Sequence, residues 1–354
     1  MYARFFNAPD GSTPLSQLAK LDTNKIKSYS YTAKFAGAGE FTLLLHFIPE
    51  YLGIIRLNDM IHYDGDWLII KNIKYDESAG ITLSGTDLGG ILSQRLALPG
   101  QAISGTTAEC ISYFLNKNIM SGADSIRRMP MSFNANDVVG ISDDGYKCLD
   151  YENLSDVICT LCDWAGIGFR IEAGREFIFK LLQGTDRSAG QNENPRVIFS
   201  PGWGNVLQQS FEHDISNMYN AVYAVNSDTG VVQVGYRDSS VTSGISRQET
   251  MVELSADTTD DLVKYALAET EDNVETHIYS VIPVSEGFGR DYSLGDKVSV
   301  RDKYTGNMFS AVITEVEKNY SGSEKSIKLT LGKQKPKLLN RIINNMIAGV
   351  QKRR

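Results

Sequence analysis

The most informative part of the sequence is Leu57-Asn-Asp-Met-Ile-His-Tyr-Asp-Gly-Asp-Trp-Leu-Ile-Ile-Lys-Asn-Ile-Lys-Tyr-Asp-Glu-Ser-Ala-Gly-Ile-Thr-Leu-Ser-Gly85. Apolar and polar residues alternate along much of this segment, which is typical of half-buried strands. Two short stretches interrupt the alternation with residues that favour tight turns, Asp64-Gly65-Asp66 and Glu77-Ser-Ala-Gly80. The segment therefore predicts three strands joined by two turns.

A second segment near the other end of the chain has the same pattern. It runs from Leu294-Gly-Asp-Lys-Val-Ser-Val-Arg-Asp-Lys-Tyr-Thr-Gly-Asn-Met-Phe-Ser-Ala-Val-Ile-Thr-Glu-Val-Glu317 through Ser321-Gly-Ser-Glu to Ile327-Lys-Leu-Thr-Leu-Gly332. Both segments start with Leu-Xaa-Asp, pass through Gly-containing turns and close with an alternating strand that ends in Gly. Such positional self-similarity predicts a duplicated structural unit. The alternative is that any antiparallel meander repeats Gly and Asp at its turns.

Further strands are predicted beside both segments. Strands over Ile26–Phe35 and Phe41–Phe47 flank a glycine turn, and strands over Val197–Ser200 and Asn220–Val225 precede a hairpin around Asp228-Thr-Gly230. We therefore expect a mainly β fold with two related tube-type β-barrels, over residues 1–100 and 196–335. An acidic segment, Ser255 to Glu275, is expected to interrupt the second barrel with a helix capped by Thr258 or Thr259, whose inward residues are Leu262, Tyr265 and Ala266.

The middle of the chain, residues 101–195, is expected to form an α/β insert domain. Thr106-Thr-Ala-Glu109 has the pattern of a capping box that opens a helix. A second helix is predicted from near Ser155 to Gly166, a residue suited to a helix C-cap. A hairpin over Phe169–Leu181 and a polar connector over Gly184–Pro195 complete the insert.

The last part of the chain, residues 336–354, predicts a basic amphipathic helix. Apolar residues recur there at helical spacing among Lys and Arg, and we expect them to contact a partner or another copy of the chain: Leu338, Leu339, Ile342, Ile343, Met346, Ile347 and Val350. The alternatives are that this stripe packs back on its own domain or lies on a membrane surface.

Composition excludes several classes of protein. Of the formal charge of −8, residues Gly332 to Arg354 contribute +7, so the rest of the chain carries −15 and should repel nucleic acid. No run of about 18 apolar residues predicts a membrane span, and the N-terminus lacks the layout of a secretory signal. Four cysteines are too few for a disulfide framework and are expected to be thiols: Cys110, Cys148, Cys159 and Cys162.

The sequence contains no recognisable catalytic, cofactor-binding or metal-binding pattern. The four histidines are scattered singly, without the spacing of metal ligands: His46, His62, His213 and His277. Cys159-Thr-Leu-Cys162 lies inside a predicted helix, and no second cysteine pair completes a zinc site. A pair of carboxylates that meet only in the fold stays possible. We therefore expect no enzyme activity, no cofactor and no metal.

Several short segments occur in an order and at a spacing that resemble the hub proteins of phage tail baseplates and tail tips, including the N-terminal part of tail-associated lysins. They are Gly39-Glu-Phe41, Ile81-Thr-Leu-Ser-Gly-Thr-Asp-Leu88 with Leu92-Ser-Gln-Arg95, Gly184-Thr-Asp-Arg-Ser188, Val197-Ile-Phe-Ser200 with Gly204-Asn205, Asn220-Ala-Val222, and Leu294-Gly-Asp296. The resemblance covers most of the chain.

The resemblance implies a homotrimer whose duplicated barrels form a pseudo-sixfold ring around a DNA exit channel. Such a ring adapts a hexameric tail tube to a threefold tip. The implied partners are a tail tube or distal tail ring protein, the C-terminus of a tape measure protein, and a separate spike, fibre or tip protein, with no specific binding of nucleic acid. The implied location is the virion tail tip or baseplate, after synthesis in the host cytoplasm. The alternatives are a tail-associated cell-wall hydrolase and a receptor-binding module.

Overall fold

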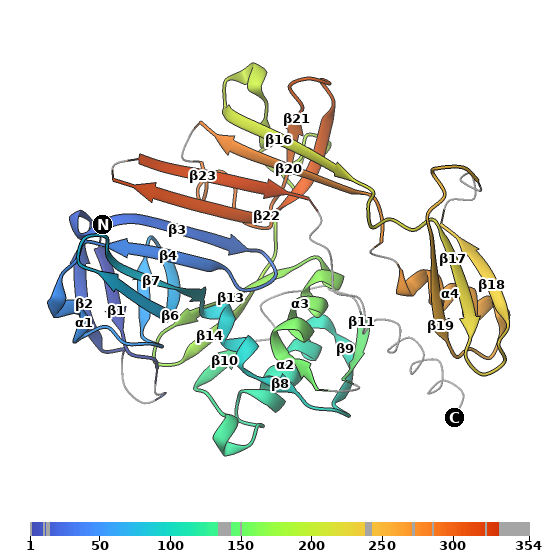
Figure 1. Ribbon diagram of the computed structural model, residues 1–354, viewed down its shortest axis with the longest axis horizontal. Coiled ribbons are helices and arrows are strands. Elements are labelled where there is room, and N and C mark those ends of the chain that lie inside the picture. The colour runs from blue at the N-terminus through green and yellow to red at the C-terminus, as the bar shows by residue number, and fades with distance from the viewer. Residues whose placement is uncertain are drawn as a thin grey trace.

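A computed structural model describes residues 2–9, 11, 15–133, 143–148, 151–237, 243–270, 273–284, 287–322 and 324–332. The first part of the chain is a set of antiparallel strands, coloured blue in Figure 1, that carry one short helix, α1 (Pro49–Leu52). The strands are β1 (Tyr2–Phe6), β2 (Gln17–Asp22), β3 (Ile26–Lys34), β4 (Glu40–Leu45), β5 (Met60–Tyr63), β6 (Asp66–Asp76) and β7 (Gly80–Asp87). The three strands and two turns predicted over Leu57–Gly85 are confirmed as β5, β6 and β7.

The middle of the chain contains two helices, α2 (Thr107–Asn118) and α3 (Leu154–Ala165). Thr106 and Glu109 form the predicted capping box, and Gly166 ends α3 in the left-handed conformation with φ 65°. Both helices pack into one buried cluster with a small sheet. The short strands of this region are β8 (Leu96–Ala97), β9 (Ala102–Thr106), β10 (Met131–Phe133), β11 (Asp143–Lys147), β12 (Glu152–Asn153), β13 (Gly168–Ala173) and β14 (Phe177–Leu182).

The third part of the chain repeats the strand arrangement of the first. Its strands are β15 (Ile198–Phe199), β16 (Val206–Asp214), β20 (Thr276–Pro283), β21 (Lys297–Arg301), β22 (Met308–Ser321) and β23 (Glu324–Leu331). The order β16-β20-β23-β22-β21 matches the order β3-β4-β7-β6-β5, and every neighbouring pair is antiparallel in both sets. We call these two sets of five strands unit 1 (β3 to β7) and unit 2 (β16 to β23, without the insertion described below).

The irregularities of the two units also coincide. A bulge follows Ile70 in β6 where it pairs with β7, and a bulge follows Ile313 in β22 where it pairs with β23. The first strands of the units, β3 and β16, carry bulges at matching positions near their starts. Bulges at the same places in both sheets fix a residue-by-residue alignment of the units. The predicted duplication is therefore present in the sheet topology.

The Leu-Xaa-Asp motif has the same local structure in both units. Asp59 accepts a hydrogen bond from the Arg56 amide (2.8 Å), and Asp296 accepts one from the Ser293 amide (3.0 Å). The residue before each aspartate has a positive φ, 69° at Asn58 and 92° at Gly295. In both units the motif thus forms a turn immediately before a strand, β5 in unit 1 and β21 in unit 2.

The insertion in unit 2 is larger than the sequence predicted. Between β16 and β20 the chain forms a separate sheet of β17 (Ala221–Asn226), β18 (Val232–Tyr236) and β19 (Glu249–Leu254), against which α4 (Thr259–Glu269) packs. Leu262 and Ala266 of α4 are buried as predicted. The assignment of Asn220–Val225 to the second barrel is wrong, because among the described strands β17 pairs only with β18 and β19. Figure 1 shows this insertion standing apart from the main sheet.

The two units join into one continuous sheet of 13 strands through the pairing of β3 with β22. In Figure 1 the red strands of unit 2 lie beside the blue strands of unit 1. No hydrogen-bonded pair among the described strands closes either unit into a barrel, so the barrel shape itself stays a prediction.

Candidate functional site

The apolar stripe predicted as the contact surface, Leu338 to Val350, lies outside the described residues. The described part of the chain instead points to the edges of the sheet as candidate contact surfaces. An edge strand presents unpaired backbone N–H and C=O groups, which another strand can satisfy. One strand junction lies inside the chain, and two open edges of the sheet correspond to its two partners.

The junction inside the chain, β3 with β22, is antiparallel and runs from the pair Lys34–Glu315 to the pair Ser28–Ser321. Tyr31 lies opposite Lys318 and is buried, with 5% of its surface exposed. β22 thus pairs on the same edge with β21 over its first half, Met308 to Val312, and with β3 over its second half, Glu315 to Ser321. We call this contact the inner junction.

A buried ion pair crosses the inner junction. The Lys318 Nζ lies 2.5 Å from the Asp66 Oδ2 and 3.5 Å from the Asp64 Oδ2, and only 8% of the Lys318 side chain is exposed. Tyr320 donates a hydrogen bond to Asp64 as well. Burial raises the pKa of the Asp66 carboxyl, although the Lys318 ammonium opposes this shift. The charge of Lys318 is therefore compensated by acids of the β5–β6 turn in the other unit.

A second buried acid supports the same strand. Asp87 accepts hydrogen bonds from the amides of Gly39 (2.8 Å) and Gly89 (2.8 Å) and from the Tyr31 hydroxyl (3.1 Å). Burial raises the pKa of Asp87 to about 6, and these donors only partly offset the shift. Asp87 thus ties β7 and the β3–β4 turn to Tyr31 of the junction.

Each partner in the inner junction has a counterpart at an open edge. β16, the counterpart of β3, is the last strand of the sheet, and no described strand pairs with its other side. β5 pairs with β6 only from Asp66 to Ile69, so the second half of β6 has an open side where β22 holds β3. The sheet therefore has two open strand edges that are complementary in the same sense as β3 and β22.

Both open edges expose aromatic side chains. Aligning the units on their bulges puts Tyr75 at the position of Lys318 and Phe211 at the position of Tyr31. Tyr75 is 64% exposed and Phe211 is 42% exposed, whereas their counterparts in the inner junction are buried. Solvated aromatic residues on an edge strand mark a surface suited to contact.

The aromatic residue on β16 belongs to a cluster of aromatic side chains. Phe211 stacks on Tyr279 with ring centroids 4.4 Å apart, and Phe309 lies 5.8 Å from Phe211. Phe309 holds the position that Asp66 holds in unit 1. In the inner junction Lys318 contacts Asp66. At the corresponding positions the open edges carry Tyr75 and Phe309, and Phe309 belongs to the aromatic cluster.

Charges on the open edges are also complementary. Glu212 follows Phe211 on β16 and Lys74 precedes Tyr75 on β6, and both side chains are exposed. In the alignment of the two junctions these positions correspond to Thr32 and Glu317, which lie directly opposite each other. Opposite charges at directly opposed positions stabilise a strand pair.

The structure brings together two histidines that sequence spacing did not connect. His213 on β16 lies opposite His277 on β20, and Glu275 lies beside both. No spacing rule finds such a pair, because the whole insertion separates them along the chain. The predicted thiols are present: Cys110, Cys148 and Cys162 are buried and Cys159 is half-buried.

Over the described ranges, no helix is both long and apolar enough to cross a membrane.

Comparison with known proteins gives one family. The profile of the family described as Siphovirus ReqiPepy6 Gp37-like protein matches residues 16–333 of the chain. No curated protein sequence matches the chain.

Solved structures of phage tail proteins share the fold of this chain. The 43 kDa tail protein of prophage MuSo2 from Shewanella oneidensis aligns over 96% of this chain and 100% of its own, with a TM-score of 0.56 and 12% identity. A tail protein from Neisseria meningitidis MC58 aligns over 95% and 97%, with a TM-score of 0.56 and 16% identity. The prophage tail protein gp18 from Listeria monocytogenes EGD-e aligns over 99% of both chains, with a TM-score of 0.54 and 15% identity.

Proposed function

Because the chain belongs to the Siphovirus ReqiPepy6 Gp37-like protein family and has the fold of phage tail proteins, we propose that it is a structural subunit of a phage tail tip or baseplate. In this proposal three chains form a ring of six similar units. The ring adapts a sixfold tail tube to a threefold tip and lines the channel through which DNA leaves.

The observation that carries the proposal is the correspondence between the inner junction and the two open edges. The β3 edge of unit 1 pairs with β22 of unit 2, whereas the outer side of β16 and one side of the second half of β6 pair with no described strand. If β16 of one chain pairs with β6 of the next, every unit makes the same head-to-tail contact. Head-to-tail contacts that close produce a ring. We call this contact the outer junction.

The alignment of the units gives the register of the outer junction. It sets Glu212 opposite Lys74 of the next chain, and Phe211 opposite Tyr75 of the next chain. The first pair has opposite charges, and the second joins Tyr75 to the cluster of Phe211 and Phe309. Both pairs favour the register that the inner junction predicts, which supports head-to-tail assembly.

Net charge supports the channel. Residues before Gly332 carry −15 in total, so a ring of these subunits repels the phosphate backbone and gives DNA little to bind. The proposed neighbours are a tail tube or distal tail ring protein on one side, and the C-terminus of a tape measure protein together with a spike, fibre or tip protein on the other. The apolar stripe from Leu338 to Val350 is the proposed attachment for one of them.

Oligomeric state in solution tests the proposal. We expect the full chain to form a trimer by native mass spectrometry, and Glu212→Lys or Lys74→Glu alone to shift the population toward monomer at equal concentration. Each change opposes like charges at the outer junction, at a cost of about 1 kcal/mol per junction. The double variant restores opposite charges at the outer junction, so we expect it to form the trimer again.

Glu193→Lys is the matched control, since Glu193 is exposed and lies in the connector before β15, on neither β6 nor β16. A chain that stays monomeric, with or without its tube-end neighbour, contradicts the ring. If the trimer population is the same in both single variants and in the double variant as in wild type, the contact between chains lies elsewhere.

A further inference from the structure

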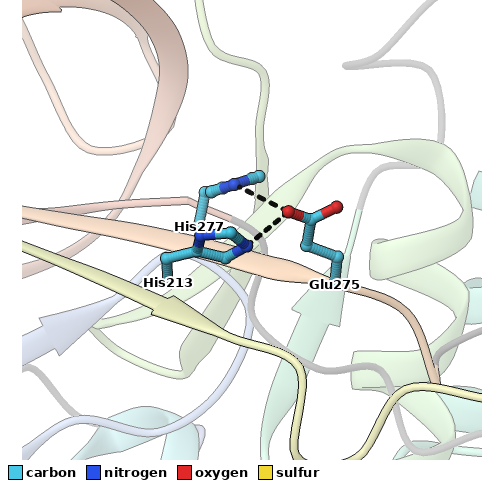
Figure 2. A group of neighbouring side chains, drawn as sticks. All are labelled: His213, Glu275 and His277. Carbon is cyan, nitrogen blue, oxygen red and sulfur yellow. Dashed lines mark ion pairs between the residues drawn. The ribbon is translucent and has the colours of Figure 1, made fainter. Parts of the chain in front are cut away.

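The insertion of unit 2 is attached to the sheet by two strands that form a narrow neck. The chain leaves the sheet at the end of β16 and returns at the start of β20, where Asp214 pairs with Thr276. One position further into the sheet, His213 lies opposite His277, with ring centroids 4.5 Å apart. Glu275, the last residue before β20, points back toward both rings (Figure 2).

These three side chains gather their ligand atoms at one point. The Glu275 Oε1 lies 3.3 Å from the Nε2 of His277 and also contacts the Nε2 of His213. One ligand atom from each residue lies within 4.8 Å of the other two. The side chains are 46% to 47% exposed, so an ion can reach them from solution.

We propose that His213, Glu275 and His277 bind one divalent transition-metal ion of the zinc class. Two imidazole nitrogens and one carboxylate oxygen form a ligand set that zinc accepts, with water in the fourth position. Metal–ligand bonds of about 2.0–2.1 Å place tetrahedral ligands roughly 3.3 Å apart. The Glu275 Oε1 and the His277 Nε2 already have this spacing, at 3.3 Å. Calcium and magnesium prefer sets of oxygen ligands, so they are poor occupants of this site.

Aromatic residues pack beside the ring of His277. The Phe211 ring is parallel to that of His277, with an interplanar angle of 8° and centroids 5.8 Å apart, and Phe211 in turn stacks on the buried Tyr279. His277, Glu275 and Tyr279 also line a cavity of about 560 Å³ beside α3. Ligands whose rotamers are fixed by packing bind a metal with less loss of conformational entropy.

A bound ion joins both strands of the neck. His213 belongs to the strand that leaves the sheet, and Glu275 and His277 belong to the segment that returns. The ion therefore fixes the insertion of β17, β18, β19 and α4 against unit 2. It also lies beside Phe211, on the strand that the proposed function assigns to the outer junction, but metal binding by a single chain does not depend on that assignment.

Zinc binding to the full chain tests this inference. After removal of metal with a chelator, we expect titration with ZnCl2 to show one saturable site per chain. His213→Ala, His277→Ala and Glu275→Gln should each weaken that site at least tenfold. His46→Ala and His62→Ala are matched controls, since these histidines lie elsewhere in unit 1 and should leave binding unchanged.

Cobalt distinguishes this site from the cysteines. A Co2+-loaded site of two histidines and one carboxylate gives weak visible bands, whereas cysteine ligation adds a strong charge-transfer band in the near ultraviolet. Weak bands that disappear in the His213→Ala/His277→Ala variant support the inference. Absence of saturable binding, a cysteine band, or unchanged binding in the double variant overturns it, and circular dichroism checks that each variant is folded.

Discussion

Lys318 and Tyr75 occupy the same position in the two units, but the side chain of Lys318 is buried in a strand junction and that of Tyr75 is exposed. The difference arises because β3 pairs with the second half of β22, whereas the corresponding side of the second half of β6 pairs with no described strand. One chain thus contains both a completed junction and the two separate halves of another. In the proposed ring, the inner junction is the template for the contact between chains.

Removing the buried lysine should weaken the inner junction. Lys318→Ala leaves Asp66 without its nearest cation, and breaking a buried ion pair costs about 3–5 kcal/mol; partial exposure of Asp66 lowers our expectation to about 2–4 kcal/mol. Denaturation with urea measures the change in the free energy of unfolding.

Lys328→Ala is the matched control. Lys328 lies on the neighbouring β23, is 44% exposed and reaches Glu317 only at 3.9 Å, so its loss should cost under about 1 kcal/mol. Equal destabilisation by the two changes would show that the ion pair to Asp66 does not stabilise the junction.

Tyr75 is the expected anchor of the outer junction. Tyr75→Ala should weaken trimer formation by about 2 kcal/mol, because an aromatic side chain buried at the centre of an interface is a typical hot spot. The free energy of unfolding of the isolated chain should change little, since Tyr75 is 64% exposed there. Analytical ultracentrifugation over a range of concentrations measures the effect.

Tyr304→Ala serves as the comparison, because Tyr304 is 86% exposed in the β21–β22 turn. If the two alanine variants assemble equally well, Tyr75 makes no contact between chains.

Asp87 should make stability depend on pH between about 4 and 6. Its pKa is raised from 3.8 to about 6, so the native state keeps a proton there that the unfolded state has released. The stability linked to this group is fully present below pH 3.8 and is lost as the pH rises through 6. From pH 4.5 to pH 7, wild type should lose on the order of 1–3 kcal/mol relative to Asp87→Asn.

Asp76→Asn is the control for this pH effect. Hydrogen bonds from Ser78 and Ala79 lower the pKa of Asp76, so its contribution is constant above the ordinary carboxyl range. If the difference between wild type and Asp87→Asn does not change from pH 4.5 to pH 7, Asp87 is ionised in the native state throughout.

Much of the fold was predictable because local signals were strong. The turn at Asp64-Gly65-Asp66, the capping box of Thr106 and Glu109, and the C-cap at Gly166 each depend on a few neighbouring residues, and each is confirmed. The repeat was predictable because the aspartate of Leu-Xaa-Asp accepts a hydrogen bond from the amide three residues earlier in both units. Expectations of this kind need no knowledge of contacts distant in sequence.

The pairings distant in sequence were not predictable in this way. Strand β17 has the alternation of any half-buried strand, and nothing in Asn220–Val225 says that it pairs with β19 rather than with β16. Likewise, Lys318 meets Asp66, and His213 meets His277, only because the sheet brings their strands together. The outer junction became a candidate only when bulge positions gave an alignment of the two units.

The most direct test of the account is a disulfide across the outer junction. In the variant Glu212→Cys/Lys74→Cys, the two new thiols lie on opposed residues of neighbouring chains, where Cβ atoms are about 4.5–5.5 Å apart. Mild oxidation should give covalent dimers and trimers on non-reducing gels, and Glu212→Cys/Asp76→Cys, which is two residues out of register, should give few. Equal crosslinking of the two variants, or none in either, would contradict the proposed pairing of β16 with β6 between chains.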